Sequence, residues 1–405
     1  MAKIFQAGPQ GEYIKSDCQV LYTPGPTPLE IQIKSKVDAL FSSAIEQLAT
    51  SALNTLGILT GKLQIIDFGA LPYVMMAQIE TVIKRAHPDI KAKALPDFKD
   101  HAKYETLSSR FRRTRLYLPG NQPKLFTNAG IHKPDSIILD LEDSVPPGEK
   151  DAARLMVRNA LRTIDFFGAE RMVRINQGSQ GFDDLDAIIP QNVQTILIPK
   201  TETAEQVIAV EDRVNFILKQ EGLKYKVYYL PILESARGIL NAPQIAMASK
   251  NNTGLAIGLE DYTADIGVPR TLGGKESLFA RSMVVNAARA AQIQPLDSVF
   301  SDISNEAGLR NMVKEAKALG FEGLGCIHPR QIQPIHEEFT PSSEDLEKAM
   351  RIVIAAEDAA ARGLGVVAVG SKMVDAPVVL RAEHTIQMAI NAGALANDWK
   401  KEALQ

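Results

Sequence analysis

The spacing of apolar residues follows one pattern in the first part of the chain and another in the rest. Apolar and polar side chains alternate over residues 29–34, which predicts a half-buried strand, and a second strand is predicted at 64–67. Between and after these strands, apolar residues recur at helical spacing over 37–56 and 74–83, as they do in helices with one buried face. The first 95 residues are therefore expected to form a small α+β domain.

From residue 112 onward, short apolar runs alternate with amphipathic helical segments. Eight runs have the length and composition of buried strands: 114–118, 136–141, 172–175, 195–198, 227–233, 254–258, 298–300 and 323–327. Near-continuous apolar strands between helices indicate a parallel sheet covered by helices. Eight such units in ~220 residues favour a (β/α)8 TIM barrel over an open sheet. No glycine-rich GxGxxG turn follows the first strand, as a dinucleotide-binding sheet would require.

The segments around the barrel complete the predicted domain order. Residues 96–111 are charged, mixed and weakly periodic, and we interpret them as a linker. The barrel is predicted over 112–335. The last part of the chain, 336–405, is expected to form a C-terminal helical or lid segment.

The composition limits which partners the protein can have and in which compartment it is expected. The 405 residues carry a formal net charge of −3 and no basic block, which argues against a nucleic-acid partner. No stretch approaches the ~20 apolar residues of a membrane span, and the first residues lack the pattern of a secretory signal. Cys18 and Cys326 lie far apart and lack metal-ligand spacing, which suits a reducing compartment. We therefore expect a cytoplasmic protein.

Ionisable residues follow almost every predicted barrel strand. They are Asp140, Glu142, Asp143, Arg174, Lys200, Glu234, Glu260, Asp261, Asp302, His328 and Arg330. The carboxyl ends of barrel strands form the active-site face, so these groups would meet at one mouth. Gathering them there is costly unless a metal ion and an anionic substrate balance the charges. The sequence therefore predicts an active site at this end of the barrel.

Carboxylates without clustered histidines or cysteines indicate a hard cation, Mg²⁺, held by one or two side chains together with water and substrate. Glu234 and Asp261 follow adjacent strands and suit this role, although each would also suit a helix cap. Arg174 is expected to hold a substrate carboxylate or a developing oxyanion, or to form a salt bridge with the acidic segment 140–143. Lys200 is disfavoured as a Schiff-base nucleophile, because its neighbours in the chain are polar.

Four further residues are assigned supporting roles. Glu142 and Asp143 are expected to orient Arg174 and metal-bound water, and Glu260 joins them behind the site. Arg115, on the first predicted barrel strand, is a candidate for substrate binding.

The strand ends resemble those of the citrate lyase beta-subunit family, part of the HpcH/HpaI aldolase superfamily. The match covers most of residues 112–385 and rests on these motifs, in this order: Leu-Tyr-Leu-Pro-Gly (116–120), Leu-Asp-Leu-Glu-Asp-Ser-Val (139–145), Val-Arg-Ile-Asn (173–176), Leu-Ile-Pro-Lys-Thr (197–201), Leu-Glu-Ser-Ala-Arg-Gly-Ile (233–239), Gly-Leu-Glu-Asp-Tyr (258–262), Ser-Asp-Ile-Ser-Asn-Glu-Ala-Gly (301–308), His-Pro-Arg-Gln-Ile (328–332) and Lys-Met-Val-Asp-Ala-Pro-Val-Val (372–379). The resemblance implies Mg²⁺ on Glu234 and Asp261 and substrate contact by Arg174. It also implies a catalytic Asp375 on a C-terminal segment that closes over a neighbouring subunit's barrel, in a homo-oligomer such as a trimer or hexamer.

The N-terminal domain resembles the acyl carrier (gamma) subunit of citrate lyase, through segments 32–41, 67–74, 77–80 and 84–86. In that family a serine in a Glu-Ser-x-Asp context carries a phosphoribosyl-dephospho-coenzyme-A arm. Aligning Asp17 with this motif places Lys15 at the attachment position and Ser16 one residue later. Two expectations follow: an arm attached to Ser16, or a vestigial carrier that serves as an assembly surface.

The resemblance implies a Mg²⁺-dependent carbon–carbon lyase that cleaves a citryl, or similar 3-hydroxyacyl, thioester to an acetyl thioester and oxaloacetate. The acyl group would be held by coenzyme A or by the arm, and in the second case the citrate lyase alpha subunit is an expected partner. Three alternatives stay open. They are a lyase of free malyl- or citramalyl-coenzyme A, a metal-dependent class II aldolase of free 2-oxo acids, and a non-catalytic carrier or scaffold.

Overall fold

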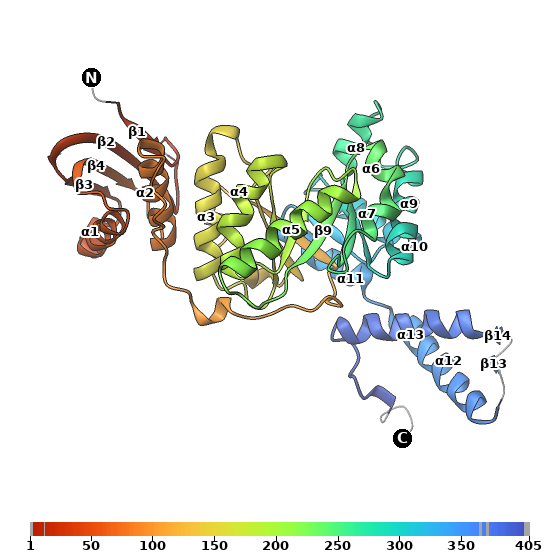
Figure 1. Ribbon diagram of the computed structural model, residues 1–405. Coiled ribbons are helices and arrows are strands. Elements are labelled where there is room, and N and C mark those ends of the chain that lie inside the picture. The colour runs from red at the N-terminus through yellow and green to blue at the C-terminus, as the bar shows by residue number, and fades with distance from the viewer. Residues whose placement is uncertain (1–2, 12, 364–366, 370–371, 401–405) are drawn as a thin grey trace.

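The computed structural model describes residues 3–11, 13–363, 367–369 and 372–400. It consists of a small N-terminal domain, a central barrel and a C-terminal helical pair, in that order along the chain (Figure 1). Within the described ranges, no helix combines the length and the apolar composition needed to cross a membrane.

The N-terminal domain is a four-stranded sheet, in the order β1-β2-β4-β3, with two helices. Its elements are β1 (Phe5–Ala7), β2 (Cys18–Pro28), β3 (Glu30–Ser35), α1 (Asp38–Thr55), β4 (Thr60–Asp67) and α2 (Pro72–Ala86). β3 and β4 pair in parallel across α1, whereas β2 pairs antiparallel with β1 and β4. The two strands and two helices predicted from periodicity are present.

The long strand β2 escaped the sequence prediction. It contains Pro24 and Pro26, and proline cannot donate a hydrogen bond to a sheet ladder, so this stretch has the composition of a turn. In the structure, the pairing of β2 with β4 is regular up to Thr23 and resumes only at Pro28. The prolines therefore occupy an interruption of the ladder, where no donor is needed.

Eight parallel strands close into a barrel, which confirms the predicted fold class. They are β5 (Thr114–Pro119), β6 (Ser136–Asp140), β7 (Glu170–Arg174), β8 (Thr195–Ile198), β9 (Tyr228–Leu233), β10 (Gly254–Ile257), β11 (Gln294–Val299) and β12 (Leu324–Cys326). The helices around them are α3 (Lys150–Thr163), α4 (Gly178–Ile188), α5 (Ala204–Gln220), α6 (Ala236–Leu240), α7 (Ala242–Ala246), α8 (Leu259–Asp265), α9 (Leu278–Ala290), α10 (Glu306–Leu319) and α11 (Ile332–Phe339). Pairing of β12 with β5 completes the ring.

The seventh barrel strand begins earlier than predicted, at Gln294 instead of residue 298. Asp297 interrupts the apolar run there, and a charge normally marks the end of a buried strand. In the fold Asp297 is fully buried and paired with Arg281 of α9, with 2.7 Å between Nη2 and Oδ2. A tertiary ion pair therefore permits a charged residue inside this strand.

The N-terminal domain is docked on the outside of the barrel, where α2 packs against α3 (Figure 1). Both guanidinium Nη atoms of Arg158 donate to the carboxylate of Glu80 at 2.8 Å, and both side chains are buried. Asn159 donates to the carbonyl of Tyr73 at 3.0 Å, and the backbone N–H of Ala94 donates to Glu80 at 2.7 Å. We call this contact the α2–α3 interface.

The C-terminal pair consists of α12 (Ser343–Ala361) and α13 (Ala376–Asn391), with the short strands β13 (Val367–Val369) and β14 (Lys372–Val374) between them. The two helices pack mainly on each other and project away from the barrel (Figure 1). The preceding helix α11 is held at the amino ends of the barrel strands, because His336 contacts Thr114 Oγ1 at 2.8 Å and Asp135 at 3.5 Å. The pair therefore leaves the barrel at the end opposite its mouth.

Candidate active site

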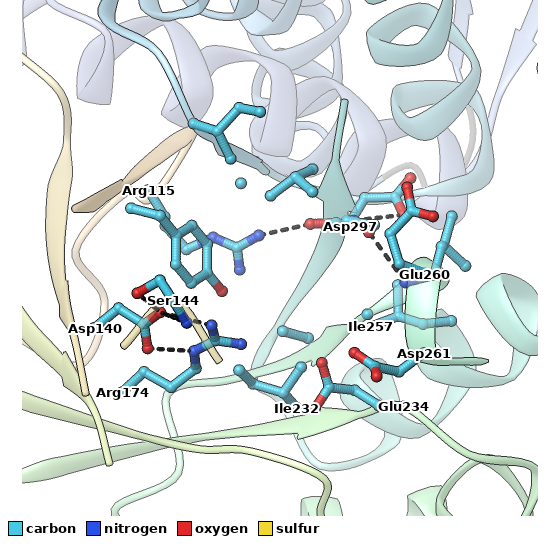
Figure 2. Close-up of a pocket in the computed structure, with 18 of the residues that line it drawn as sticks. Arg115, Asp140, Ser144, Arg174, Ile232, Glu234, Ile257, Glu260, Asp261 and Asp297 are labelled. Atoms are coloured by element: carbon cyan, nitrogen blue, oxygen red, sulfur yellow. Dashed lines mark hydrogen bonds and ion pairs between the residues drawn. The ribbon is translucent and has the colours of Figure 1, made fainter. Parts of the chain in front are cut away.

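A cavity of about 320 Å³ opens at the carboxyl ends of the barrel strands (Figure 2). Its charged lining comes from widely separated parts of the sequence: Arg115, Asp140, Arg174, Glu234, Glu260, Asp261 and Asp297. The first six were candidates from the sequence, whereas Asp297 was not. The floor beneath them is the apolar interior of the barrel, formed by inward side chains from β6 to β11.

Arg174 is held by a two-bonded contact with Asp140. Its Nε and Nη2 atoms donate to the two oxygens of the Asp140 carboxylate, each at 2.7 Å, and the hydroxyl of Ser144 donates to the same carboxylate. Burial acts to lower the pKa of Arg174, but the hydrogen bonds and charge of Asp140 outweigh burial and raise it. Arg174 therefore forms the predicted salt bridge and also lines the cavity. The salt bridge holds its positively charged side chain in a fixed position in the cavity wall.

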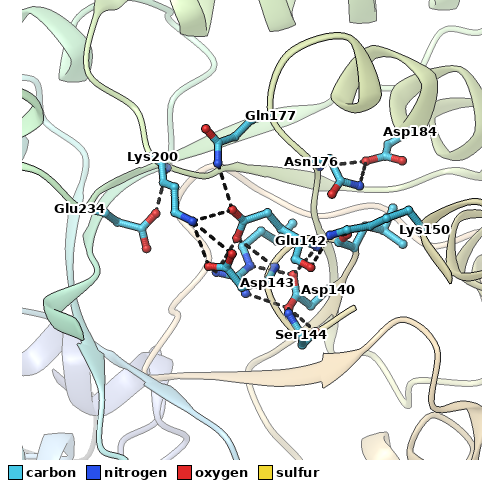
Figure 3. Close-up of polar contacts among 12 residues, drawn as sticks. Asp140, Glu142, Asp143, Ser144, Lys150, Asn176, Gln177, Asp184, Lys200 and Glu234 are labelled. Atoms are coloured by element: carbon cyan, nitrogen blue, oxygen red, sulfur yellow. Dashed lines mark hydrogen bonds and ion pairs between the residues drawn. The ribbon is translucent and has the colours of Figure 1, made fainter. Parts of the chain in front are cut away.

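Glu142 and Asp143 lie next to Arg174 and also bind Lys200, as Figure 3 shows for the lysine. Lys200 Nζ is 3.1 Å from a carboxylate oxygen of each residue, and Arg174 Nη1 is 3.2 Å from Glu142. Burial lowers the pKa of Lys200, yet its hydrogen bonds to the two carboxylates raise it overall. Lys200 is thus a stable ammonium group, which agrees with the argument against a Schiff-base nucleophile.

Glu234 and Asp261 face the cavity side by side from the end of β9 and the first turn of α8 (Figure 2). Burial raises the pKa of Glu234 to about 7, with Asp261 adding to the effect, although the backbone N–H of Lys200 donates to Glu234 at 2.8 Å. Among the described residues, neither carboxylate forms an ion pair with a cationic side chain. Neither is a helix cap, because Ser235 caps α6 and Gly258 occupies that position in α8.

Two adjacent carboxylates without a cationic partner suit a divalent metal ion. Nowhere in the described part of the chain do three or more His, Cys, Asp or Glu side chains gather as a metal site. A pair is the number of protein ligands that Mg²⁺ commonly uses, with water and substrate oxygens in the other positions. The donor set of Glu234 and Asp261 therefore fits Mg²⁺.

Gly258 makes room for Glu234, which the sequence analysis did not foresee. A Cβ atom added to Gly258 would lie 2.3 Å from Oε1 of Glu234, so a larger residue would displace the carboxylate. The glycine directly precedes the Leu-Glu-Asp segment that supplies Asp261, and that position was the only signal available in the sequence.

The remaining candidates at the mouth have other roles. Glu260 is exposed and pairs with Arg270 at 2.7 Å on the rim of the cavity. Asp302 does not line the cavity and binds Ser304, while His328 caps the turn Pro329–Gln331. In the sequence, Asp302 and His328 follow barrel strands just as the cavity residues do. The direction of the backbone after each strand decides whether the side chain points into the cavity.

Two predicted residues lie away from this cavity. Asp375 begins α13, where its carboxylate accepts a hydrogen bond from the backbone N–H of Val378 at 3.2 Å. The C-terminal pair that carries it leaves from the opposite end of the barrel, so the chain does not bring Asp375 to its own mouth. Ser16 precedes β2 in the N-terminal domain, with its backbone N–H bonded to Phe68 and a φ of 57°.

Comparisons with known proteins agree with this geometry. A family model described as HpcH/HpaI aldolase/citrate lyase matches residues 113–329, and an acyl-carrier model described as malonate decarboxylase delta subunit matches residues 9–86. The chain is 38% identical to citrate lyase subunit beta of Leuconostoc mesenteroides subsp. cremoris, over 72% of this chain and 97% of that protein. It is 32% identical to mitochondrial citramalyl-CoA lyase of Mus musculus, over 71% of this chain and 89% of that protein.

A solved structure extends the likeness to three dimensions. The crystal structure of CitE from Mycobacterium tuberculosis, in complex with magnesium, acetoacetate and coenzyme A, superposes with a TM-score of 0.58 and 31% identity, over 70% of this chain and 99% of that one. The first family model spans more than half of the 405 residues and contains the barrel strands. With the curated relatives matched over nearly their whole length, these findings show that the chain belongs to the HpcH/HpaI aldolase/citrate lyase family.

Proposed function

We propose that this protein is a Mg²⁺-dependent carbon–carbon lyase, which cleaves a citryl-type 3-hydroxyacyl thioester to an acetyl thioester and oxaloacetate. The observation that carries the proposal is that two carboxylates without a cationic partner, Glu234 and Asp261, face Arg174 across one cavity. Asp140 holds Arg174 in its position there. The similar citrate lyase subunits and the magnesium and coenzyme A bound to the similar CitE structure support it.

Each charged group then has a part in the reaction. Glu234 and Asp261 would hold Mg²⁺, which when bound polarises the oxygens of the substrate's hydroxyl and adjacent carboxylate. Arg174, oriented by Asp140, stabilises the negative charge that develops on the thioester oxygen as the carbon–carbon bond breaks. Glu142 and Asp143 keep Arg174 and Lys200 in place.

The bond cleavage needs a base that takes the proton from the substrate hydroxyl, and we assign this role to Asp375 of a neighbouring copy. The electrons of the O–H bond form the ketone of oxaloacetate. The electron pair of the broken carbon–carbon bond becomes the enolate of the acetyl thioester, which takes the proton back at its CH₂ carbon. No atom is gained or lost beyond the two products.

The metal assignment is tested by replacing each carboxylate in turn. Glu234→Ala and Asp261→Ala are expected to abolish Mg²⁺-dependent cleavage and to weaken binding of Mn²⁺, a spectroscopic substitute that can be followed by electron paramagnetic resonance. Asp302→Ala is a matched control, because Asp302 also follows a barrel strand but does not line the cavity. Full turnover in either site variant would show that the metal lies elsewhere.

The acyl group is carried either by coenzyme A or by an arm on Ser16. The position of Ser16 allows the second choice. Its backbone N–H donates to the carbonyl of Phe68, just before α2, and Tyr73 at the start of α2 donates to the carbonyl of Pro123 in the loop after β5. This end of α2 therefore lies on the side of the barrel where the mouth opens. Intact mass of the protein from its own host tests this directly: an added phosphoribosyl-dephospho-coenzyme-A group supports a carrier-bound substrate. An unmodified mass supports a lyase of free coenzyme A esters.

A further inference from the structure

Arg115 places a cation in the wall of the cavity that the proposed mechanism does not use. It lies on the inward face of β5, together with Tyr117 and Pro119, and only 2% of its surface is exposed. Figure 2 shows its guanidinium group directed towards Asp297. Arg174 lies over the ring of Tyr117, with 5.4 Å between its Cζ atom and the ring centre.

The charge of Arg115 has no carboxylate partner among the described residues. Its one hydrogen bond runs from Nη2 to the backbone carbonyl of Asp297, at 2.6 Å, while Nε and Nη1 are buried and unpartnered. The Asp297 carboxylate is already engaged, since it accepts from Arg281 at 2.7 Å and from the backbone N–H of Ser298 at 2.9 Å.

Other buried or half-buried arginines of this chain have more hydrogen-bond partners than Arg115 has. Arg112, Arg158 and Arg174 each bind a carboxylate through two nitrogens. Arg171 has no carboxylate but donates to three backbone carbonyls. Arg115 differs from all of them, because it combines an unbalanced charge with two unused donors beside a ligand cavity.

Burying an unpaired charge destabilises a protein, and the burial lowers the pKa of Arg115. Such a cation is compensated when an anionic ligand fills the cavity and accepts its free N–H groups. The cavity then contains three separate recognition points: the carboxylate pair, Arg174 and Arg115. A substrate that uses all three must bring one more anionic group than the metal site and Arg174 require.

We propose that Arg115 binds a second free carboxylate of the substrate and so selects the citryl group among related acyl groups. This inference rests on the proposed lyase function. In that reaction class the carbon bearing the hydroxyl also bears one carboxylate, and the remaining substituent is carboxymethyl in a citryl thioester, methyl in a citramalyl thioester and hydrogen in a malyl thioester. Only the carboxymethyl group accepts hydrogen bonds from a guanidinium, so oxaloacetate is the favoured product over pyruvate or glyoxylate.

The first test compares kcat/KM for citryl-CoA and citramalyl-CoA in the wild-type protein, Arg115→Met and Arg115→Lys. The wild-type protein is expected to prefer citryl-CoA by about 100-fold or more, and Arg115→Met to lose most of that preference, as expected when one partner of a buried charge pair is removed. Arg115→Lys keeps the charge and should recover part of it. Arg270→Met, which removes a cation from the rim, should leave the ratio unchanged. A ratio that Arg115→Met does not alter would overturn the proposal.

A binding experiment separates this inference from the proposed function. Calorimetry in the presence of Mg²⁺ should show that the wild-type protein binds oxaloacetate more tightly than pyruvate, and that Arg115→Met binds the two acids about equally. Thermal unfolding of Arg115→Met checks that the fold is intact. If the wild-type protein cleaves neither thioester but prefers oxaloacetate, the lyase function fails and the anion site stands. If it cleaves thioesters but binds both acids equally, only the anion site fails.

Discussion

The two ends of the chain relate to the barrel in opposite ways (Figure 1). The N-terminal domain buries an ion pair between Glu80 and Arg158 in the α2–α3 interface and shares part of the barrel's apolar core through Tyr73. The C-terminal pair has its own small core, formed between α12 and α13. The N-terminal domain thus packs tightly against the outside of the barrel. The C-terminal helices are stabilised mainly by contacts with each other.

This difference indicates a different function for each end of the chain. A carrier domain that shuttles between active sites must be free to move, but the N-terminal domain is anchored by buried polar contacts that are lost if it moves away. The C-terminal pair instead exposes large apolar side chains, including Met373 and Leu380, and presents Asp375 far from the mouth of its own barrel. Exposed apolar groups on both sides of Asp375 suit contact with a partner, in agreement with the proposed role of Asp375 at a neighbouring copy.

The largest effect is expected when the C-terminal end is tested by mixing subunits. Glu234→Ala and Asp375→Ala chains should each lose turnover by about 100-fold or more. After they are co-expressed, some mouths combine an intact Glu234 with an intact Asp375 from the other chain, and turnover should rise well above either parent. A chain with both substitutions, mixed with Asp375→Ala, is the control that cannot recover. If the first mixture stays as inactive as this control, Asp375 does not act across subunits.

A smaller effect, on stability, is expected at the N-terminal end. Arg158→Ala removes both guanidinium hydrogen bonds from the buried Glu80 carboxylate, which keeps Lys84 at 2.7 Å as its remaining cation. The substitution should lower the free energy of unfolding by about 3 kcal/mol, measured by urea denaturation. Arg85→Ala breaks a partly exposed ion pair with Asp151 and two hydrogen bonds to the backbone carbonyls of Gln6 and Gly148 in the same contact. Because water can replace these partners, it should cost less, about 1 kcal/mol. Equal effects of the two substitutions would mean that the interface is loose and that the domain is mobile.

Much of the site was predictable because barrel architecture converts sequence position into spatial position. Once the apolar runs are assigned to parallel strands, the residues that follow them must meet at one mouth. Asp140, Arg174, Glu234 and Asp261 were found in this way and line the cavity. Asp302 satisfied the same rule but lies outside the cavity, because the rule gives the end of the barrel and not the direction of a side chain.

Residues whose role depends on tertiary contacts were harder to identify from the sequence. Gly258 matters only because the Glu234 side chain crosses its Cα. Arg115 was named as a candidate, yet nothing in its neighbours along the chain shows that its guanidinium is left without a carboxylate. That property depends on Asp297 being taken by Arg281, a pairing between a helix and a strand.

The sequence by itself determined the barrel, the order of the domains and the charged groups at the mouth, because periodicity and strand order are local properties of the chain. The tertiary structure alone decided which charges are paired and which are not. It also decided that the N-terminal domain is anchored while Asp375 is carried away from its own mouth. Pairing, burial and reach depend on contacts between residues far apart in the chain, and no local pattern encodes them.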